Sequence, residues 1–196
     1  MKKNFIRLVL IILSCNISMY ADEPVINKKK PWYIPQSFTI QCAGNIGFLS
    51  VGTGTQFFKG RLFASLMYGY VPKSIGKTEI HLVTLKNVIN LGKKTGADLS
   101  FTPYLGHTFS YETGNNSFLR LPDKYPKGYY ATNAFHFTFF AGGKIHKDFS
   151  KTEVFHGIDF YAELGTVDTY LWYFIRSKKV ALKDIVSAAI GINVYF

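Results

Sequence analysis

The segment "SAAIGINVYF" (residues 187–196) decides the fold, because its apolar side chains recur at every second position. The alternating apolar set comprises Ala188, Ile190, Ile192, Val194 and Phe196. The residues between them are smaller or more polar. A two-residue period indicates a β-strand, whose side chains alternate between two faces. We therefore expect the sequence to end in a strand rather than in a frayed tail.

The same alternation recurs in the preceding sequence and predicts strands at 61–70, 79–87, 99–112, 134–145 and 157–165. Residues 38–58 are expected to supply two shorter strands, divided near "AGNIG" (43–47). Turn chemistry separates these segments, as in "KG" (59–60), "VPKSIGK" (71–77), "GKKTG" (92–96) and "SKK" (177–179). Several alternating segments of about ten residues predict a sandwich or a barrel.

Two features favour a barrel in a membrane. One face of the strands is apolar and aromatic, whereas the other carries charges that do not suit the dry core of a sandwich. The 18 Phe and 13 Tyr residues also exceed what one small core could bury. We therefore predict an all-β fold, a closed antiparallel transmembrane β-barrel of eight strands, the smallest common closed size. Aromatic residues near strand ends suit interfacial girdles: Tyr68, Tyr70, Tyr111, Tyr170 and Trp172.

The connections are expected to differ in length between the two ends of this barrel. Short turns at 59–60, 92–96 and 148–156 are assigned to the periplasmic side, and the longer segments 71–77, 113–133 and 175–183 to the outside.

One conflict remains in "HGIDFYAELGTVDTYLWYF" (156–174). If the alternation of the apolar residues in 158–164 continued unchanged, the side chain of Asp168 would face lipid. Either a bulge at Gly165 resets the phase, or this strand rises above the bilayer.

The N-terminus carries a basic segment, the apolar run "LVLIIL" and then Ala21, which predicts a signal peptide over residues 1–21. Lipid attachment at Cys15 is the alternative. Residues 22–37 form a polar periplasmic lead-in, and residues 38–196 form the barrel. Removal of Lys2, Lys3 and Arg7, with no acidic residue, lowers the formal charge from +11 to +8. Cys42 is then the single cysteine, which excludes a disulfide within the chain.

A terminal Phe preceded by alternating apolar residues resembles the assembly signal of Gram-negative outer-membrane barrels. The matching positions are Ala188, Ile190, Ile192, Val194 and Phe196. The segment "YGYVPKSIGKTEIHLVTLK" (68–86) is also similar to segments of uncharacterised small outer-membrane proteins, and brings no activity with it. The resemblance implies a location in the bacterial outer membrane and the assembly machinery there as a partner. Outer-membrane lipids and lipopolysaccharide suit a basic exported chain better than nucleic acid does.

The polar faces of the predicted strands define a candidate lumen network of Glu79, His81, Glu112, His136, Lys144, Asp159, Tyr161 and Glu163. An eight-stranded barrel is just wide enough for side chains to fill, so these groups are expected to pair with one another. This predicts a filled lumen and a non-enzymatic structural or surface-interaction role.

Two alternatives stay open: a lipid A-modifying enzyme, either an acyl hydrolase or an acyltransferase, and a narrow pore. The catalytic candidates are Glu79, His81, His136 and Glu163, of which Glu79 and His81 share one face. His107 and Ser110 lie three apart and should point to opposite faces. The histidines do not show metal-ligand spacing, so no metal and no cofactor is predicted.

The loop "LPDKYPKGYYATN" (121–133) is the most distinctive external element. Its basic and aromatic residues could contact the sugars or phosphates of lipopolysaccharide: Lys124, Tyr125, Lys127, Tyr129 and Tyr130. Alternatively, the tyrosines anchor the barrel at the headgroup level.

Overall fold

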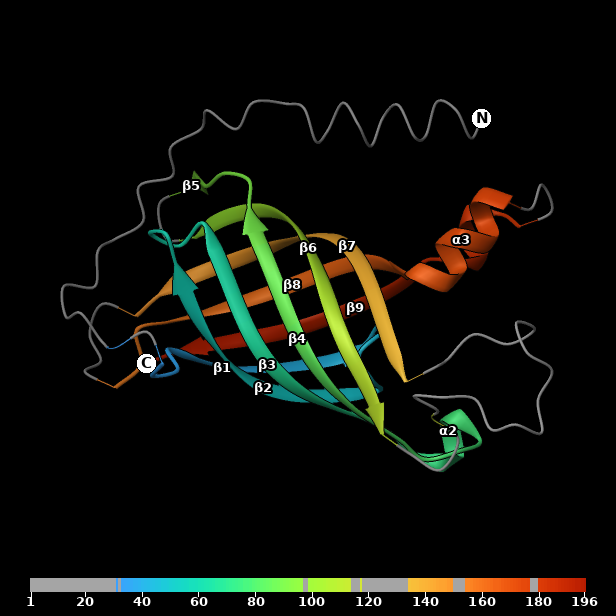
Figure 1. Cartoon of the computed structure of the whole chain (residues 1–196). Coiled ribbons are helices and arrows are strands. Elements are labelled where there is room, and N and C mark those ends of the chain that lie inside the picture. The colour runs from blue at the N-terminus through green and yellow to red at the C-terminus, as the bar shows by residue number, and fades with distance from the viewer. Residues whose placement is uncertain are drawn as a thin grey trace.

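The computed structural model describes residues 31, 33–96, 99–113, 117, 134–149, 154–176 and 180–196. In this part of the chain, eight strands form a closed antiparallel barrel (Figure 1), which confirms the predicted fold class. They are β1 (Ser37–Ala43), β2 (Leu49–Phe57), β3 (Leu62–Val71), β4 (Ile80–Asn90), β6 (Ser100–Thr113), β7 (Phe135–Asp148), β8 (Gly157–Val167) and β9 (Ser187–Tyr195). The expected signal peptide lies outside the described residues.

The barrel closes because the first and last strands pair with each other and β4 pairs directly with β6. The order around the ring is β4-β3-β2-β1-β9-β8-β7-β6. The two-residue strand β5 (Lys94–Thr95) adds only a short pairing to the beginning of β6. A closed antiparallel sheet satisfies the backbone N–H and C=O groups of its strands with no open edge, which is what a hydrocarbon environment demands.

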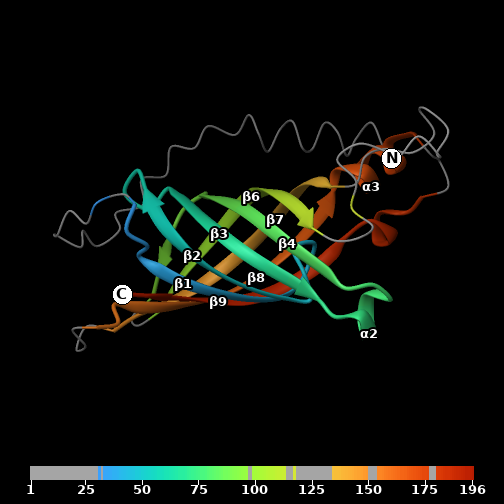
Figure 2. The same cartoon turned by 60° about the horizontal axis from the view of Figure 1, so that its bottom comes forward.

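The two ends of the barrel differ (Figures 1 and 2). At one end, here the helix end, lie the β1–β2 turn, the short helix α2 (Lys73–Gly76) and the helix α3 (Asp168–Arg176). At the other, here the terminal end, lie β5, the β2–β3 turn and the end of β9. The β2–β3 turn uses left-handed backbone at Phe58, Lys59 and Gly60, consistent with a turn at "KG". The 38–58 segment divides into β1 and β2 around "AGNIG", as predicted.

Along β3, β6, β7, β8 and β9 the inward and outward residues are the expected ones. In β4 the prediction is wrong, because the two faces are exchanged. Thr84 and Lys86 are buried, whereas Val83 and Leu85 are exposed, so His81 faces outward with them. The expected phase relied on Ile80 and Leu82, at the very beginning of the strand. The apolar residues further along determine the true phase, because they are the ones that the barrel turns away from its polar interior.

The segment around Asp168 also differs from both expectations. The β7–β8 pairing runs without interruption from Val167 to Gly157, so these described strands contain no bulge at Gly165. Instead the strand ends at Val167, and α3 begins at Asp168, whose carboxylate accepts a 2.7 Å hydrogen bond from the backbone N–H of Thr169. A 3₁₀ helix, Leu182–Asp184, precedes β9. Among the residues that the structure describes, no helix combines the length and the apolar character needed to cross a bilayer.

The β1–β2 turn lies in the helix-end mouth of the barrel. Ile46 in this turn is 2 % exposed, and its backbone lies against Gly69 of β3. A Cβ atom at Gly69 would lie 1.7 Å from the carbonyl oxygen of Ile46, so this approach requires glycine. The turn therefore folds into the mouth and narrows it.

Candidate functional site

The middle of the lumen holds a buried ion pair between Lys86 of β4 and Glu163 of β8. The Lys86 ammonium lies 2.8 Å from both carboxylate oxygens of Glu163 and donates a 2.7 Å hydrogen bond to Oε1 of Gln41. The hydroxyl of Tyr104 donates to Glu163, and the hydroxyl of Tyr161 donates to Gln41, each over 3.1 Å. Five residues from the four strands β1, β4, β6 and β8 thus form one network, which ties opposite walls of the barrel together.

Aromatic rings surround the same ammonium group. Its nitrogen lies 4.9 Å from the ring centroid of Phe140 and 4.7 Å from that of Tyr161, within the range of cation–π contacts. The side chains of Lys86 and Glu163 are 4 % and 7 % exposed. Removing two charges from water is costly, and it is offset here because each charge has its counter-ion and further hydrogen bonds.

A second cluster lies toward the terminal end around Asp159, which is fully buried. Its carboxylate accepts hydrogen bonds from the Tyr195 hydroxyl at 2.6 Å and from the Asn193 amide at 3.4 Å. The Lys144 ammonium lies 3.4 Å away and His146 Nδ1 lies 2.5 Å away. One carboxylate therefore has four polar neighbours, two of them potential cations.

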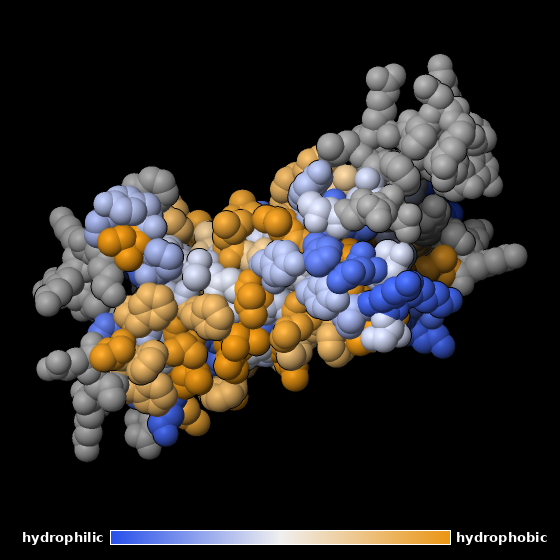
Figure 3. All heavy atoms as spheres, turned by 90° about the horizontal axis from the view of Figure 1, so that it is seen from below, coloured by the Kyte–Doolittle hydropathy of each residue, from blue (hydrophilic) through white to orange (hydrophobic). Residues whose placement is uncertain are grey.

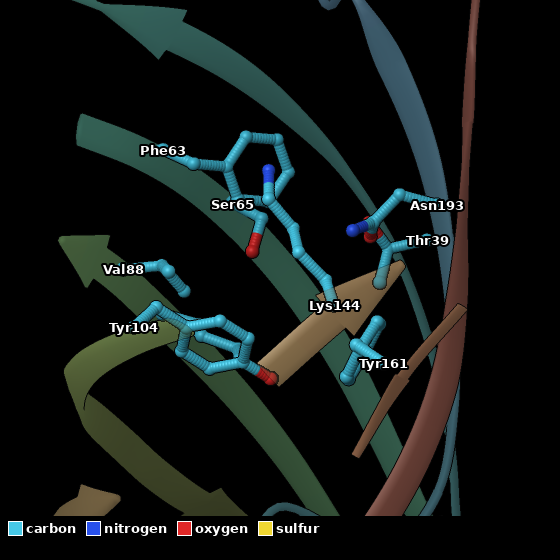
Figure 4. Close-up of a pocket in the computed structure, with 9 residues that line it drawn as sticks. Thr39, Phe63, Ser65, Val88, Tyr104, Lys144, Tyr161 and Asn193 are labelled. Carbon is cyan, nitrogen blue, oxygen red and sulfur yellow. The ribbon is translucent and has the colours of Figure 1, made fainter. Parts of the chain in front are cut away.

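A small cavity separates the two clusters (Figure 4). Lys144 extends across it toward Phe63 and Ser65, while Asn193 and Thr39 lie side by side on its wall. Thr39 donates a 2.7 Å hydrogen bond to Asn193. The cavity is lined by Thr39, Phe63, Ser65, Lys86, Val88, Tyr104, Lys144, Tyr161 and Asn193.

Between the central cluster and the helix end, small polar side chains fill the barrel. Ser50, Thr84 and Ser110 are completely buried, and the hydroxyls of Thr84 and Ser110 lie 2.8 Å apart. Met67 beside them is 1 % exposed. The barrel is therefore packed at this level rather than open, as expected for a cylinder of eight strands.

A third pair lies near the helix-end mouth. His136 Nε2 is 3.2 Å from Glu112 Oε2, and Ser117 donates a 2.6 Å hydrogen bond to the other oxygen of the same carboxylate. The side chains of His136 and Glu112 are 24 % and 17 % exposed.

Glu79 and His81 do not belong to the lumen, so their assignment to the lumen network was wrong. Glu79 precedes β4, and His81 lies on the outer face of the barrel at the helix end. They form an exposed rim cluster with two tyrosines. The Tyr68 hydroxyl lies 2.5 Å from His81 Nδ1, the Tyr70 hydroxyl donates to Glu79 at 2.7 Å, and His81 Nε2 is 3.9 Å from Glu79.

The structure separates the four catalytic candidates into three places. Glu79 and His81 are on the rim, His136 pairs with Glu112 at the mouth, and Glu163 pairs with Lys86 in the middle. His107 faces outward and Ser110 inward, so they point to opposite faces.

The six remaining members of the proposed lumen set all face the interior: Glu112, His136, Lys144, Asp159, Tyr161 and Glu163. The described side chains contain no group of three His, Cys, Asp or Glu residues that could hold a metal ion. The loop residues Lys124, Tyr125, Lys127, Tyr129 and Tyr130 lie outside the described residues.

Sequence reasoning missed three residues of the central cluster: Lys86, Gln41 and Tyr104. The signal for Lys86 was present, because Thr84 and Lys86 alternate with Val83 and Leu85. Gln41 carried a similar signal, since it lies between the apolar residues Ile40 and Cys42. The meeting of these side chains follows from the closure of the barrel and not from any spacing along the chain.

No protein-family model matches the sequence, and no curated protein matches it either. Among solved structures, the chain is similar to the crystal structure of the N-terminal beta-barrel domain of Pseudomonas aeruginosa OprF. The TM-score is 0.40 at 16 % sequence identity, and the match covers 83 % of this chain and 98 % of that domain. The fold assignment therefore rests on the strand pairing described above.

Proposed function

We propose that this protein is an integral β-barrel of the bacterial outer membrane with a structural or surface-interaction role. The observation that carries the proposal is the outer wall, the set of outward-facing side chains around the ring. Every one of the eight strands contributes a large apolar residue at least 37 % exposed: Phe38, Leu49, Val51, Leu66, Tyr68, Val83, Leu85, Ile89, Phe101, Phe109, Phe135, Phe139, Ile145, Phe160, Leu164 and Ile190.

This distribution is the reverse of that in a protein folded in water. The apolar side chains lie outside, and the ion pairs Lys86–Glu163 and Lys144–Asp159 lie inside. Figure 3 shows apolar surface over the middle of the barrel on the face in view, with hydrophilic side chains gathered at one end. A closed sheet with an apolar exterior suits hydrocarbon, whereas apolar surface of this extent in water would promote aggregation.

The lengths of the connections support an orientation of the barrel in the membrane, with the helix end outside. Residues 114–134, between β6 and β7, form the longest connection and leave from the helix end, whereas the terminal end has the short β2–β3 turn. Long external loops and short periplasmic turns are typical of outer-membrane barrels. The rim cluster and α3 then lie on the external side, where the proposed partners are lipopolysaccharide and other outer-membrane lipids.

The filled lumen favours a structural role over conduction. The carboxylates of Asp159 and Glu163 are engaged by cations and hydroxyls, and fully buried hydroxyl side chains occupy the space beyond them. In planar bilayers we therefore expect no conductance steps. Defined open-channel steps would replace the structural role with a pore.

The exposed rim cluster holds two of the catalytic candidates, Glu79 and His81. Mass spectrometry of lipid A separates a structural role from a lipid A-modifying activity. The samples are cells without the protein, cells with the protein and cells with the His81→Ala variant. We expect the same acyl pattern in all three samples. An acyl change that depends on His81 would favour the enzyme instead.

Location is tested by fractionation of cells that express the full chain, followed by gel electrophoresis before and after boiling. The protein is expected in the outer-membrane fraction, with different mobility when unboiled because a closed barrel resists detergent. Recovery in the soluble or inner-membrane fraction, with one mobility, would overturn the proposal.

A further inference from the structure

The middle of the outer wall carries an unexpected polar pair, Asn87 of β4 and His107 of β6. The two residues are cross-strand partners, and Asn87 Nδ2 lies 3.3 Å from His107 Nε2. Along β6, His107 has three outward positions on either side of it, from Phe101 to Leu105 and from Phe109 to Thr113. The pair therefore lies near mid-height of the wall, where hydrocarbon offers no hydrogen-bond partner.

The pair leaves open the second N–H and the Oδ1 of the Asn87 amide and the Nδ1 of the His107 ring. An amide nitrogen can only donate, so Nε2 of His107 accepts, and Nδ1 of the neutral ring carries its proton. Among the contacts of the described residues, neither Nδ1 of His107 nor Oδ1 of Asn87 has a hydrogen-bond partner. The imidazole is held parallel to the ring of Phe137, with centroids 5.7 Å apart and an interplanar angle of 8°.

We propose that the β4–β6 face is an interface with a second copy of this chain in the membrane, an inference that rests on the outer-membrane location proposed above. Two copies inserted in the same direction are related by a two-fold axis parallel to the membrane normal. About such an axis at the β4–β6 seam, Asn87 of one copy faces His107 of the other. Each Nδ1–H then donates to an Oδ1, so the imidazole donor and the amide oxygen of both copies are satisfied at once.

A second copy is favoured over lipid because acyl chains cannot satisfy these groups. A second copy is also favoured over an unrelated protein. The His107 donor and the Asn87 acceptor lie side by side, so a copy rotated by 180° presents its acceptor to the donor and its donor to the acceptor. Hydrogen bonds between membrane segments are worth about 1–2 kcal/mol in model systems, so loss of the pair is expected to weaken association about tenfold or more.

The test uses the full chain with Cys15→Ser, labelled at Cys42 and reconstituted in phospholipid vesicles. Cys42 is exposed on β1, on the opposite side of the ring from the β4–β6 seam, so a dye there stays clear of the interface. Two-step photobleaching is expected for the parent chain and one step for Asn87→Leu/His107→Leu. The matched control is Thr53→Leu, which also removes an exposed polar side chain from the outer wall, on β2, and should still give two steps.

Cross-linking gives a second measurement. With Leu85→Cys in a Cys15→Ser/Cys42→Ser background, oxidation should link two copies, whereas the native Cys42 should not. Single-step bleaching of the inserted parent chain, or dimers that survive the double substitution, would overturn the interface while leaving the barrel proposal intact. Cross-links in cells to a different protein would also overturn it. Failure of every variant to insert, seen as unchanged mobility on boiling, would overturn both proposals.

Discussion

Lys86 and Asn87 are consecutive residues of β4, and their surroundings show how the two faces of the barrel differ. Lys86 points into the lumen, is 3 % exposed and contacts the Glu163 carboxylate and the Gln41 amide. Asn87 points to the outer wall, where its polar neighbour is His107. In the lumen, the charged groups of Lys86 and Glu163 are satisfied by partners within the chain. On the wall, Asn87 and His107 use only part of their hydrogen-bonding capacity on each other, and what remains can be satisfied only by what lies next to the barrel. Four substitutions test this contrast, in order of expected effect.

The largest effect is expected from Lys86→Met, which leaves the Glu163 carboxylate buried without its cation. Removal of one partner of a buried pair costs about 3–5 kcal/mol, and the free energy of unfolding in urea with phospholipid vesicles should fall by this amount. The double variant Lys86→Met/Glu163→Gln should recover most of the loss, because the neutral amide can still accept from Tyr104. A double variant no more stable than the single one would contradict the assigned ion pair.

The next effect comes from a charge on the outer wall. Ile190 is 63 % exposed on β9, so in water Ile190→Arg would change little. In a bilayer an arginine at mid-height of the lipid-facing wall should cost about 2–4 kcal/mol of unfolding free energy. Ile75→Arg on α2, also exposed but outside the barrel, is the control and should cost about 0–1 kcal/mol. Equal effects at the two positions would show that the wall does not face hydrocarbon.

A smaller effect is expected from Gly52→Ala inside the barrel. A Cβ atom at Gly52 would lie 2.3 Å from the carbonyl oxygen of Leu66 and 2.8 Å from the Cα atom of Met67. Overpacking of this kind costs about 1–3 kcal/mol. The neighbouring Thr53→Ala, on the outward side, should stay within about 0.5 kcal/mol. If Gly52→Ala were neutral in urea titration, the lumen at this level would not be tightly packed.

The smallest effect is expected from His81→Ala on the rim. Glu79 and His81 are 57 % and 36 % exposed, and exposed pairs of this kind contribute about 0.2–1 kcal/mol. Unfolding free energy should therefore change by less than about 1 kcal/mol, measured as for the other variants. A loss as large as that of Lys86→Met would mean that the rim cluster stabilises the barrel as the lumen does.

The phase of most strands could be predicted, because long alternating segments such as "HFTFF" and "DFYAEL" repeat the pattern several times. β4 was misassigned where the evidence was shortest, since only Ile80 and Leu82 set the phase and a one-residue shift moves every side chain to the other face. That shift placed His81 inside and hid Lys86. The strand predicted at 157–165 was expected to continue past Asp168, yet the described strand pairing ends at Val167 and residues Asp168–Arg176 form α3.

The sequence by itself determined the strands, their alternating faces and the division of 38–58, because these are local properties of neighbouring residues. Only the tertiary structure decided which polar groups meet. Lys86 and Glu163 are 77 residues apart, and their contact depends on the pairing of β4 with β6, which closes the ring. The same closure puts Asn87 beside His107 on the outer wall. Such contacts are set by the register of a closed sheet, and no spacing along a single strand encodes it.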